Sequence, residues 1–232
     1  MSALFGPAGN PENFPYKSSA DAPRWLRELG LDCYEYQCGK GVHVGEDTAR
    51  RVGLAAQREG VTLSLHAPYF INLANPDREA LQKTTGYITG ACLVADWMGA
   101  RRVVIHSGAL MKRTRREALD TALYSLREVI AACDASGFAH IALCPETMGK
   151  INQLGDLDEV LELCTLDERL LPCVDFGHLY ARSLGADQGA EAMERILDRM
   201  EAVLGPERAS RFHSHFSHIC LLYTSPSPRD RT

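Results

Sequence analysis

The chain has 232 residues, of which 45% are hydrophobic and 24% charged, and its formal net charge at pH 7 is −5. These values are typical of one ordinary globular domain and exclude a disordered or fibrous chain. The negative charge argues against a protein that coats nucleic acid through a global positive field, but it is compatible with a local basic surface.

The same sequence limits where the protein works. No apolar stretch approaches the roughly 20 residues that a membrane crossing needs, so we expect no membrane partner. The N-terminal residues lack a basic region followed by an apolar region, so we expect no secretory signal and a cytoplasmic location. The eight cysteines form no CxxC pair, and we expect most of them to be small buried side chains.

Short apolar runs alternate along the chain with longer segments of helical period, which predicts repeated βα units around a parallel sheet. The segments between the runs carry apolar residues at three- and four-residue spacing, and several end at a glycine able to adopt positive φ. We expect seven strands, at residues 3–5, 33–36, 62–65, 102–105, 141–144, 172–174 and 212–216. The predicted fold class is therefore α/β, a (β/α)8 TIM barrel.

The end of the chain differs from the rest. Residues 220–232, CLLYTSPSPRDRT, show neither helical nor strand periodicity and do not supply a last βα unit. We therefore expect an incomplete TIM-barrel domain over residues 1–219, followed by a non-native tail over residues 220–232. No break in composition within the first of these ranges indicates a second domain.

Six potential metal ligands lie at or just beyond the downstream ends of the expected strands. In a barrel these strand ends meet at one mouth, so residues far apart in sequence converge there. Imidazole and carboxylate donors without a thiolate are typical of catalytic zinc, manganese or iron. One histidine on an apolar strand is more often a core residue, so the prediction depends on the whole set. The candidates are His66, His106, Glu146, Asp175, His178 and His215.

Two of these assignments leave alternatives open. Asp175 either ends its strand with the carboxylate in the mouth, where Gly177 lets the chain return His178 to the same pocket, or it caps the following helix. In the second case His178 faces solvent. The alternation of a strand also turns His213 and His215 to the same side, so either could be the ligand.

Five motifs in chain order resemble the endonuclease IV family of apurinic/apyrimidinic endonucleases: HAPYFINLA from His66, then VVIHSG, PETMGKINQLG, CVDFGHLYAR and HSHFS. The resemblance runs from FGPAG near the N-terminus to HFS near residue 217. It implies a xylose isomerase-like barrel that holds about three zinc ions in the complete family site and fewer in this chain, with manganese as a possible replacement. It also implies cleavage of double-stranded DNA on the 5′ side of abasic sites in base excision repair. We expect a monomer without an obligate protein partner.

The resemblance distributes the ligands among the ions. It assigns His66 and His106 to the first ion and His178 to the third. The second ion is held by Asp175 and His215, and the catalytic Glu146 bridges the first and second ions. His213 would then contact the ligand His215 without binding an ion itself. The family completes its site with an aspartate and a histidine beyond the seventh strand and a glutamate at the eighth, and the chain ends before supplying them. We therefore expect this polypeptide to be inactive or weakly active.

Two further segments are candidates for DNA contact. Tyr69 follows His66 in the loop above the mouth, where its ring would pack on an abasic sugar or on an exposed base. The resemblance also places a tyrosine here, although packing on neighbouring apolar residues is an equal alternative. Asn72 is expected to brace this loop. Four cations follow the next expected strand, and they would oppose the helix dipole unless they met an anion such as a phosphate. They are Lys112, Arg113, Arg115 and Arg116.

Two other functional classes compete with the nuclease prediction. A xylose isomerase-like sugar isomerase or epimerase would use one divalent ion held by Glu146, Asp175 and His215. The third class is a non-catalytic DNA- or sugar-binding barrel. The additional histidines favour a cluster of ions over a single one. Metal content separates the classes, because about three ions indicate the nuclease, one indicates the isomerase and none indicates a binding protein.

Overall fold

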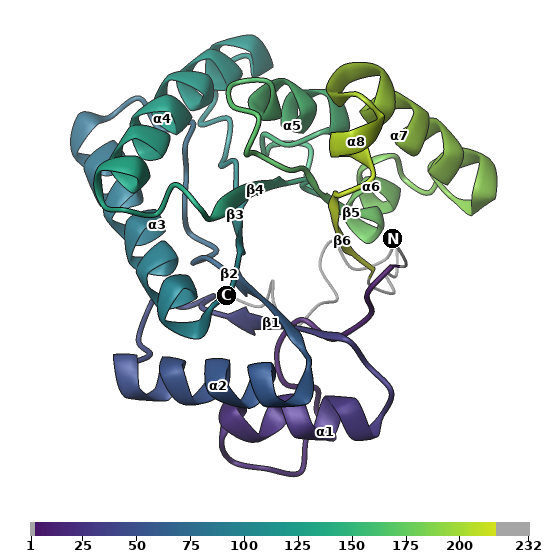
Figure 1. Cartoon of the computed structure of the whole chain (residues 1–232). Coiled ribbons are helices and arrows are strands. Elements are labelled where there is room, and N and C mark those ends of the chain that lie inside the picture. Colours follow the sequence, from purple (N-terminus) through teal and green to yellow (C-terminus); the bar gives the residue numbers. More distant parts are fainter. Residues whose placement is uncertain (1–2, 217–232) are drawn as a thin grey trace.

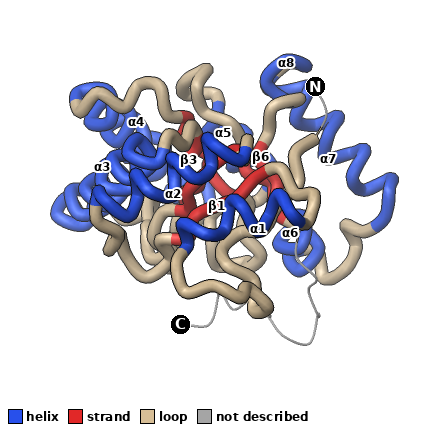
Figure 2. The backbone as a smooth tube through the Cα atoms, turned by 60° about the horizontal axis from the view of Figure 1, so that its bottom comes forward, coloured by secondary structure: helices blue, strands red, loops and turns tan. Residues whose placement is uncertain are grey.

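The strands form one parallel sheet that curls into a ring. The computed structural model describes residues 3–216. In these residues six strands pair in chain order, each with the next, and the helices surround them (Figures 1 and 2). The strands are β1 Cys33–Gln37, β2 Thr62–His66, β3 Arg102–His106, β4 Ala142–Glu146, β5 Cys173–Asp175 and β6 His213–His215. The α/β barrel prediction is confirmed, with six strands in the described part of the chain.

The helices lie outside the ring of strands (Figure 1). In chain order they are the 3-10 helix η1 Ser19–Asp21, then α1 Ala22–Glu28, α2 Glu46–Glu59, α3 Arg78–Met98, α4 Arg115–Ala135, α5 Leu157–Cys164, α6 Phe176–Arg182, α7 Gly189–Leu204 and α8 Pro206–Ala209. Within residues 3–216, none of the helices combines the length and apolarity that a bilayer crossing requires.

Local signals in the sequence set the helix ends. The α4 helix begins with a capping box, in which the Thr114 side chain accepts from the Glu117 amide and the Glu117 side chain accepts from the Thr114 amide. The α2 and α3 helices end at Gly60 and Gly99, whose φ angles are 66° and 72°. A residue without a Cβ adopts this left-handed conformation at little cost. The chain therefore turns toward the next strand directly after each of these helices.

The expected strand at residues 3–5 is wrong. The chain instead runs beside β1 over residues 5–9, where the Glu35 amide donates to the Pro7 carbonyl at 3.1 Å and the Gly9 amide donates to the Glu35 carbonyl at 2.9 Å. Pro7 has no N–H, so the segment cannot form a regular strand ladder. The other six strands lie within two residues of their expected positions. The expected tail at 220–232 lies outside the described residues.

Alternate strand residues face opposite sides of the sheet. Leu65, Val103 and Ile105 are completely buried and belong to the large core between the sheet and the helices. Val104 and Cys144 belong to a separate small cluster, as expected for side chains that face the inside of the barrel. The seven cysteines in the described residues are all free, and six of them are buried, as predicted.

Truncation of a core leucine should reveal how far the fold depends on the layer between sheet and helices. Leu126 in α4 is 0% exposed, so we expect Leu126→Ala to lower the free energy of unfolding by about 2–5 kcal/mol through lost burial and a new cavity. The matched control is Leu54→Ala, because Leu54 also lies on a helix but is 61% exposed. We expect it to change stability by less than about 0.5 kcal/mol. Urea denaturation measures both, and equal losses would contradict the core assignment.

Candidate functional site

Five of the six predicted ligands lie at the same end of the barrel. Each is the last residue of its strand, and each side chain is buried. They are His66 of β2, His106 of β3, Glu146 of β4, Asp175 of β5 and His215 of β6. Because neighbouring parallel strands end together, residues separated by up to 149 positions in the sequence share one small volume, as the barrel geometry requires.

Glu146 is the centre of this arrangement. Its Oε2 lies 3.1 Å from Nε2 of His66 and 3.1 Å from Nε2 of His106. Its Oε1 lies 2.7 Å from Nδ1 of His215. Burial raises the pKa of Glu146, but the charge of His215 and the hydrogen bonds from the histidines outweigh burial and hold this pKa well below its usual range. The carboxylate is therefore ionised in the interior.

In His66 and His106, the contact made by Nδ1 determines which ring nitrogen carries the proton of the neutral ring. Nδ1 of His66 lies 2.7 Å from the Ala67 carbonyl, and Nδ1 of His106 lies 3.0 Å from the Tyr69 carbonyl. A carbonyl only accepts, so both Nδ1 atoms carry a proton, and in the neutral ring Nε2 keeps the lone pair. Without a cation the two Nε2 atoms can donate to Glu146 only as protonated rings. When a cation takes the place of those protons, two lone pairs and one Glu146 oxygen converge on the same point. This arrangement fits a divalent cation, which the three donors would hold together.

A second group of possible ligands shares Glu146 with the first. Ligand atoms of Glu146, Asp175 and His215 lie within 4.8 Å of one another. Asp175 also accepts from the His178 amide at 2.8 Å, so it caps α6. Asp175 therefore has both of the roles that the sequence left open. One oxygen caps α6, and the carboxylate also lies beside Glu146 at the mouth. Burial raises the pKa of Asp175, and the nearby His178 partly opposes this shift.

His178 lies beside this cluster at its edge. Its side chain is 14% exposed, and its Nδ1 lies 2.8 Å from the Thr147 carbonyl and 3.9 Å from Oε1 of Glu146. The expected alternative of a solvated histidine therefore does not hold. Among the described residues, the groups of three close ligand atoms do not include His178. Its assignment to a third ion stays a prediction.

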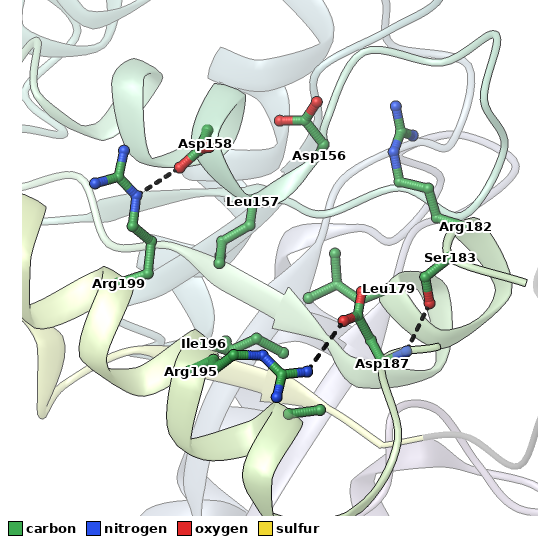
Figure 3. Close-up of a pocket in the computed structure, with 11 residues that line it drawn as sticks. Asp156, Leu157, Asp158, Leu179, Arg182, Ser183, Asp187, Arg195, Ile196 and Arg199 are labelled. Carbon is green, nitrogen blue, oxygen red and sulfur yellow. Dashed lines mark hydrogen bonds and ion pairs between the residues drawn. The ribbon is translucent and has the colours of Figure 1, made fainter. Parts of the chain in front are cut away.

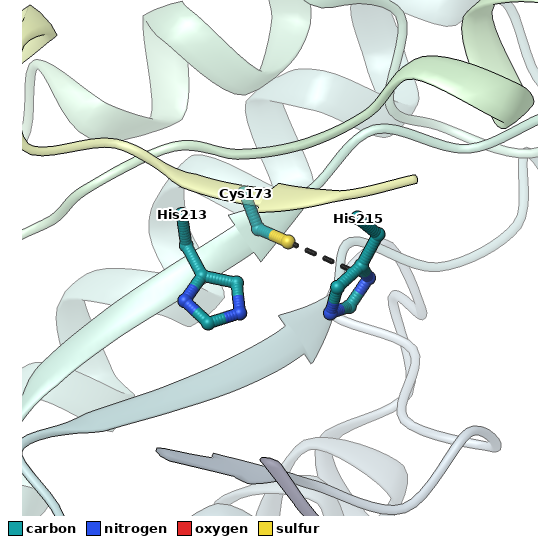
Figure 4. Close-up of side chains that lie close together, drawn as sticks. All are labelled: Cys173, His213 and His215. Atoms are coloured by element: carbon teal, nitrogen blue, oxygen red, sulfur yellow. Dashed lines mark hydrogen bonds between the residues drawn. The ribbon is translucent and has the colours of Figure 1, made fainter. Parts of the chain in front are cut away.

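Sequence reasoning missed Glu35, a buried carboxylate in the middle of β1. Its oxygens lie 2.9 Å from Nε2 of His213 and 3.0 Å from Nε2 of His215. Both histidines project from the same side of β6, as the alternation predicted, and Cys173 lies beside them (Figure 4). Burial raises the pKa of Glu35, but His215 and His213 outweigh burial and lower it well below its usual range. The available signal was alternation, because the polar residues Glu35 and Gln37 alternate with Tyr34 and Tyr36.

The Tyr69 ring covers the first group of ligands. It stacks on the His106 ring at 5.5 Å between centroids, and its hydroxyl donates to the Gln37 side chain at 2.5 Å. Gly39 makes this position possible, because a Cβ there would lie 2.2 Å from the Tyr69 ring. The expected alternative, packing on neighbouring apolar residues, does not describe this contact. Contact with DNA stays a prediction.

Asn72 braces two loops at the mouth. Its Oδ1 accepts from the amides of Ala74 and Ala109, each at 3.1 Å. Gly108 allows this approach, because a Cβ there would lie 1.9 Å from Oδ1 of Asn72. The loop after β2 is therefore held to the loop after β3 by one side chain. This supports a bracing role, whereas direct contact with DNA stays a prediction.

The basic run at the start of α4 is largely engaged within the protein. Nε of Arg115 donates to buried Glu159 at 2.7 Å, and Arg116 pairs with acidic residues of α4 and α5. Arg113 donates to a backbone carbonyl in the loop after β2. Lys112 is exposed and has no ion pair among residues 3–216. A phosphate would have to compete for the three arginines, so Lys112 is the cation best placed to meet one.

A hollow of about 410 Å³ lies elsewhere on the molecule, between α5, α6 and α7 (Figure 3). Its wall carries opposite charges that pair with each other. Arg199 lies 2.7 Å from Asp158, and Arg195 lies 3.8 Å from Asp187. None of the predicted ligands lines it. The chemistry of the molecule is therefore concentrated at the barrel mouth and not in this hollow.

Comparison with known proteins identifies the family of the barrel. Residues 23–218 match the family described as xylose isomerase-like TIM barrel. An uncharacterized protein of Methanocaldococcus jannaschii is 33% identical over 93% of this chain and 77% of its own length. A probable endonuclease 4 of Mycoplasma pneumoniae is 32% identical over 57% of this chain and 46% of its own length. The chain thus spans about half the length of that endonuclease relative.

Solved structures share the fold. Endonuclease IV from Thermus thermophilus aligns with a TM-score of 0.61 and 22% identity, over 82% of this chain and 68% of the other. A D-tagatose 3-epimerase-like protein aligns with a TM-score of 0.63 and 20% identity, over 78% of this chain and 66% of the other. At such identities the likeness establishes the barrel and not the reaction.

The bracing by Asn72 can be tested without any substrate. Asn72→Ala would leave the amides of Ala74 and Ala109 without their acceptor, so we expect the local opening free energy at these amides to fall by about 1–3 kcal/mol. Hydrogen exchange followed by NMR measures this loss directly. Asn152→Ala on the exposed surface is the control and should leave both amides protected. Equal protection in Asn72→Ala and the parent chain would show that the side chain does not hold the loops.

Proposed function

The chain belongs to the xylose isomerase-like TIM-barrel family, and on this basis we propose that it is a hydrolase of the endonuclease IV type, which cleaves double-stranded DNA 5′ to abasic sites in base excision repair. The observation that carries the proposal is the number of ligands at the mouth. His66, His106 and Glu146 form one group, and Glu146 with Asp175 and His215 forms another. Two groups that share a carboxylate suit two or more neighbouring ions better than one.

The donor set suggests which ions. Nitrogen and carboxylate ligands without thiolate suit zinc, with manganese as a substitute. We propose one ion at each of the two groups and a third beside His178, which would make about three in total. When bound, such ions polarise a phosphoryl oxygen and neutralise the charge that develops during hydrolysis.

The side chains of the protein would prepare this chemistry. Glu146 belongs to both groups of ligands and connects them, because its two oxygens face different histidines. The backbone carbonyls of Ala67 and Tyr69 keep His66 and His106 in the form that presents Nε2 to the centre. Tyr69 presents an aromatic face beside them, on which an extrahelical sugar or base would stack. Lys112 would meet a backbone phosphate.

A second candidate function has a specific observation in its favour. Glu146, Asp175 and His215 would hold one divalent ion without any help from β2 and β3. A single-ion site of this kind would suit a sugar epimerase, and an epimerase-like protein is among the similar structures. His66 and His106 would then have no role in the reaction. The nuclease proposal uses all five residues and is therefore the stronger one.

Cleavage of a defined lesion tests the proposed reaction. Because the chain lacks part of the family's ligand set, we expect only weak nicking 5′ to a single abasic site in duplex DNA, abolished by a zinc chelator and restored by zinc. Glu146→Gln should reduce the rate by about 100-fold or more, because it removes the charge shared by the two groups. Glu128→Gln, on the exposed face of α4, is the matched control and should cleave like the parent chain. Failure of a folded, zinc-loaded protein to cut, together with ketose epimerisation, would replace this proposal by the second one.

Metal binding can be tested separately from catalysis. Zinc should raise the melting temperature, since a ligand at 100 times its Kd adds about 2.7 kcal/mol of stability. The rise should be smaller at pH 6 than at pH 8, because bound metal displaces protons from histidine and acid restores them. Differential scanning calorimetry and elemental analysis measure the two quantities. Two or three ions per chain support the nuclease, one supports the epimerase, and none contradicts both.

A further inference from the structure

We propose that Glu35 is a positioning residue, which fixes the proton of His215 on Nε2 and thereby keeps the lone pair of Nδ1 directed at the metal site. The inference rests on the proposed metal-dependent function, because the free Nδ1 matters only when a cation uses it. It adds to the site a residue of β1, the strand that contributes no ligand to the two groups around Glu146. The contacts of both ring nitrogens and of both carboxylate oxygens support it.

The two ring nitrogens of His215 face two different carboxylates. Nδ1 lies 2.7 Å from Oε1 of Glu146, on the side where Asp175 completes the second group. Nε2 lies 3.0 and 3.1 Å from the two oxygens of Glu35. A neutral imidazole carries one proton, and a carboxylate can only accept it. Without a cation both nitrogens of His215 donate, Nδ1 to Glu146 and Nε2 to Glu35. When a metal takes the place of the Nδ1 proton, the proton donated to Glu35 stays on Nε2, and Nδ1 is the nitrogen that binds the metal.

The surroundings of Glu35 suit a hydrogen-bond acceptor and not a metal ligand. The residue is 4% exposed. Besides His215, Oε1 accepts from Nε2 of Gln37 at 2.6 Å, and Oε2 accepts from Nε2 of His213 at 2.9 Å. Both oxygens are therefore occupied by donors, which stabilise the buried charge. A carboxylate held in this way orients a ligating histidine and increases its basicity.

The same contacts connect Glu35 to the rim of the site. Gln37 donates to Glu35 and accepts from the Tyr69 hydroxyl, so one chain of hydrogen bonds runs from His215 through β1 to the ring above the mouth. The backbone also fixes Glu35, because its amide and carbonyl bind the segment at residues 5–9. Glu35 thus has little freedom to move, as a residue that orients a ligand requires.

Two substitutions separate proton placement from packing. Glu35→Gln keeps the shape of the side chain but adds an amide donor, which can bind the lone pair of Nε2 and shift the ring proton to Nδ1. Glu35→Asp shortens the side chain but keeps a group that only accepts. We expect zinc affinity at the His215 site to fall about 10- to 100-fold in Glu35→Gln. We expect a smaller loss in Glu35→Asp, although it leaves the larger void.

The readouts are zinc affinity, from competition with a chelating dye, and the tautomer of His215, from long-range proton–nitrogen NMR of the zinc-loaded protein. Wild type should show a proton on Nε2 and zinc on Nδ1. Glu159→Gln is the matched control, because Glu159 is also a buried glutamate but lies outside the cluster, and its zinc affinity should equal that of wild type.

Three results would overturn the inference. The first is a Gln variant that binds zinc as tightly as wild type, and the second is an Asp variant weaker than the Gln variant, which indicates packing. The third is zinc on Nε2 of His215 in the wild-type protein, a measurement that needs no variant and so holds even if Glu35→Gln fails to fold. Failure of the proposed function looks different, because the wild-type chain itself would then bind no divalent metal.

Discussion

The interaction on which the site depends is the contact of one buried carboxylate, Glu146, with three histidines from three other strands. An ionised carboxylate in the interior is costly unless it is paired, and here each oxygen faces at least one imidazole nitrogen. Two of the rings have their outer nitrogens bound to backbone carbonyls. The inner nitrogens are therefore committed to Glu146, and the cluster is most stable when a cation is present or the rings are protonated.

The barrel makes this cluster possible through its inner face. Outward residues of the strands pack against the helices in the main core, and inward residues form a different set, small and apolar in the middle of β3 to β5 and polar at the mouth. Glu35 departs from this gradient, because it places a charge below the mouth. Its hydrogen-bond donors, the side chains of Gln37, His213 and His215, offset the burial and connect the lower layer to the mouth.

The loops above the strands are connected by side-chain contacts. Asn72 joins the loops after β2 and β3, and Tyr69 fits only because Gly39 leaves space for its ring. Arg115 and Arg116, the first two residues of α4, form ion pairs with Glu159 and Glu162. The rim therefore combines an aromatic surface with exposed lysines in the loops after β1, β3 and β4. Under the proposed function these groups would meet the DNA backbone more than the base edges.

The sequence by itself determined the alternation of strands and helices, the barrel, and five ligands at strand ends, because hydrophobic periodicity and strand direction are local properties. The tertiary structure alone decided how those ligands divide between the two oxygens of Glu146, and that Asp175 both caps a helix and joins the cluster. It also revealed Glu35, whose partners His213 and His215 lie about 180 residues away. Which side chains meet across the curled sheet depends on strand register and curvature, and the local pattern of residues does not encode either of them.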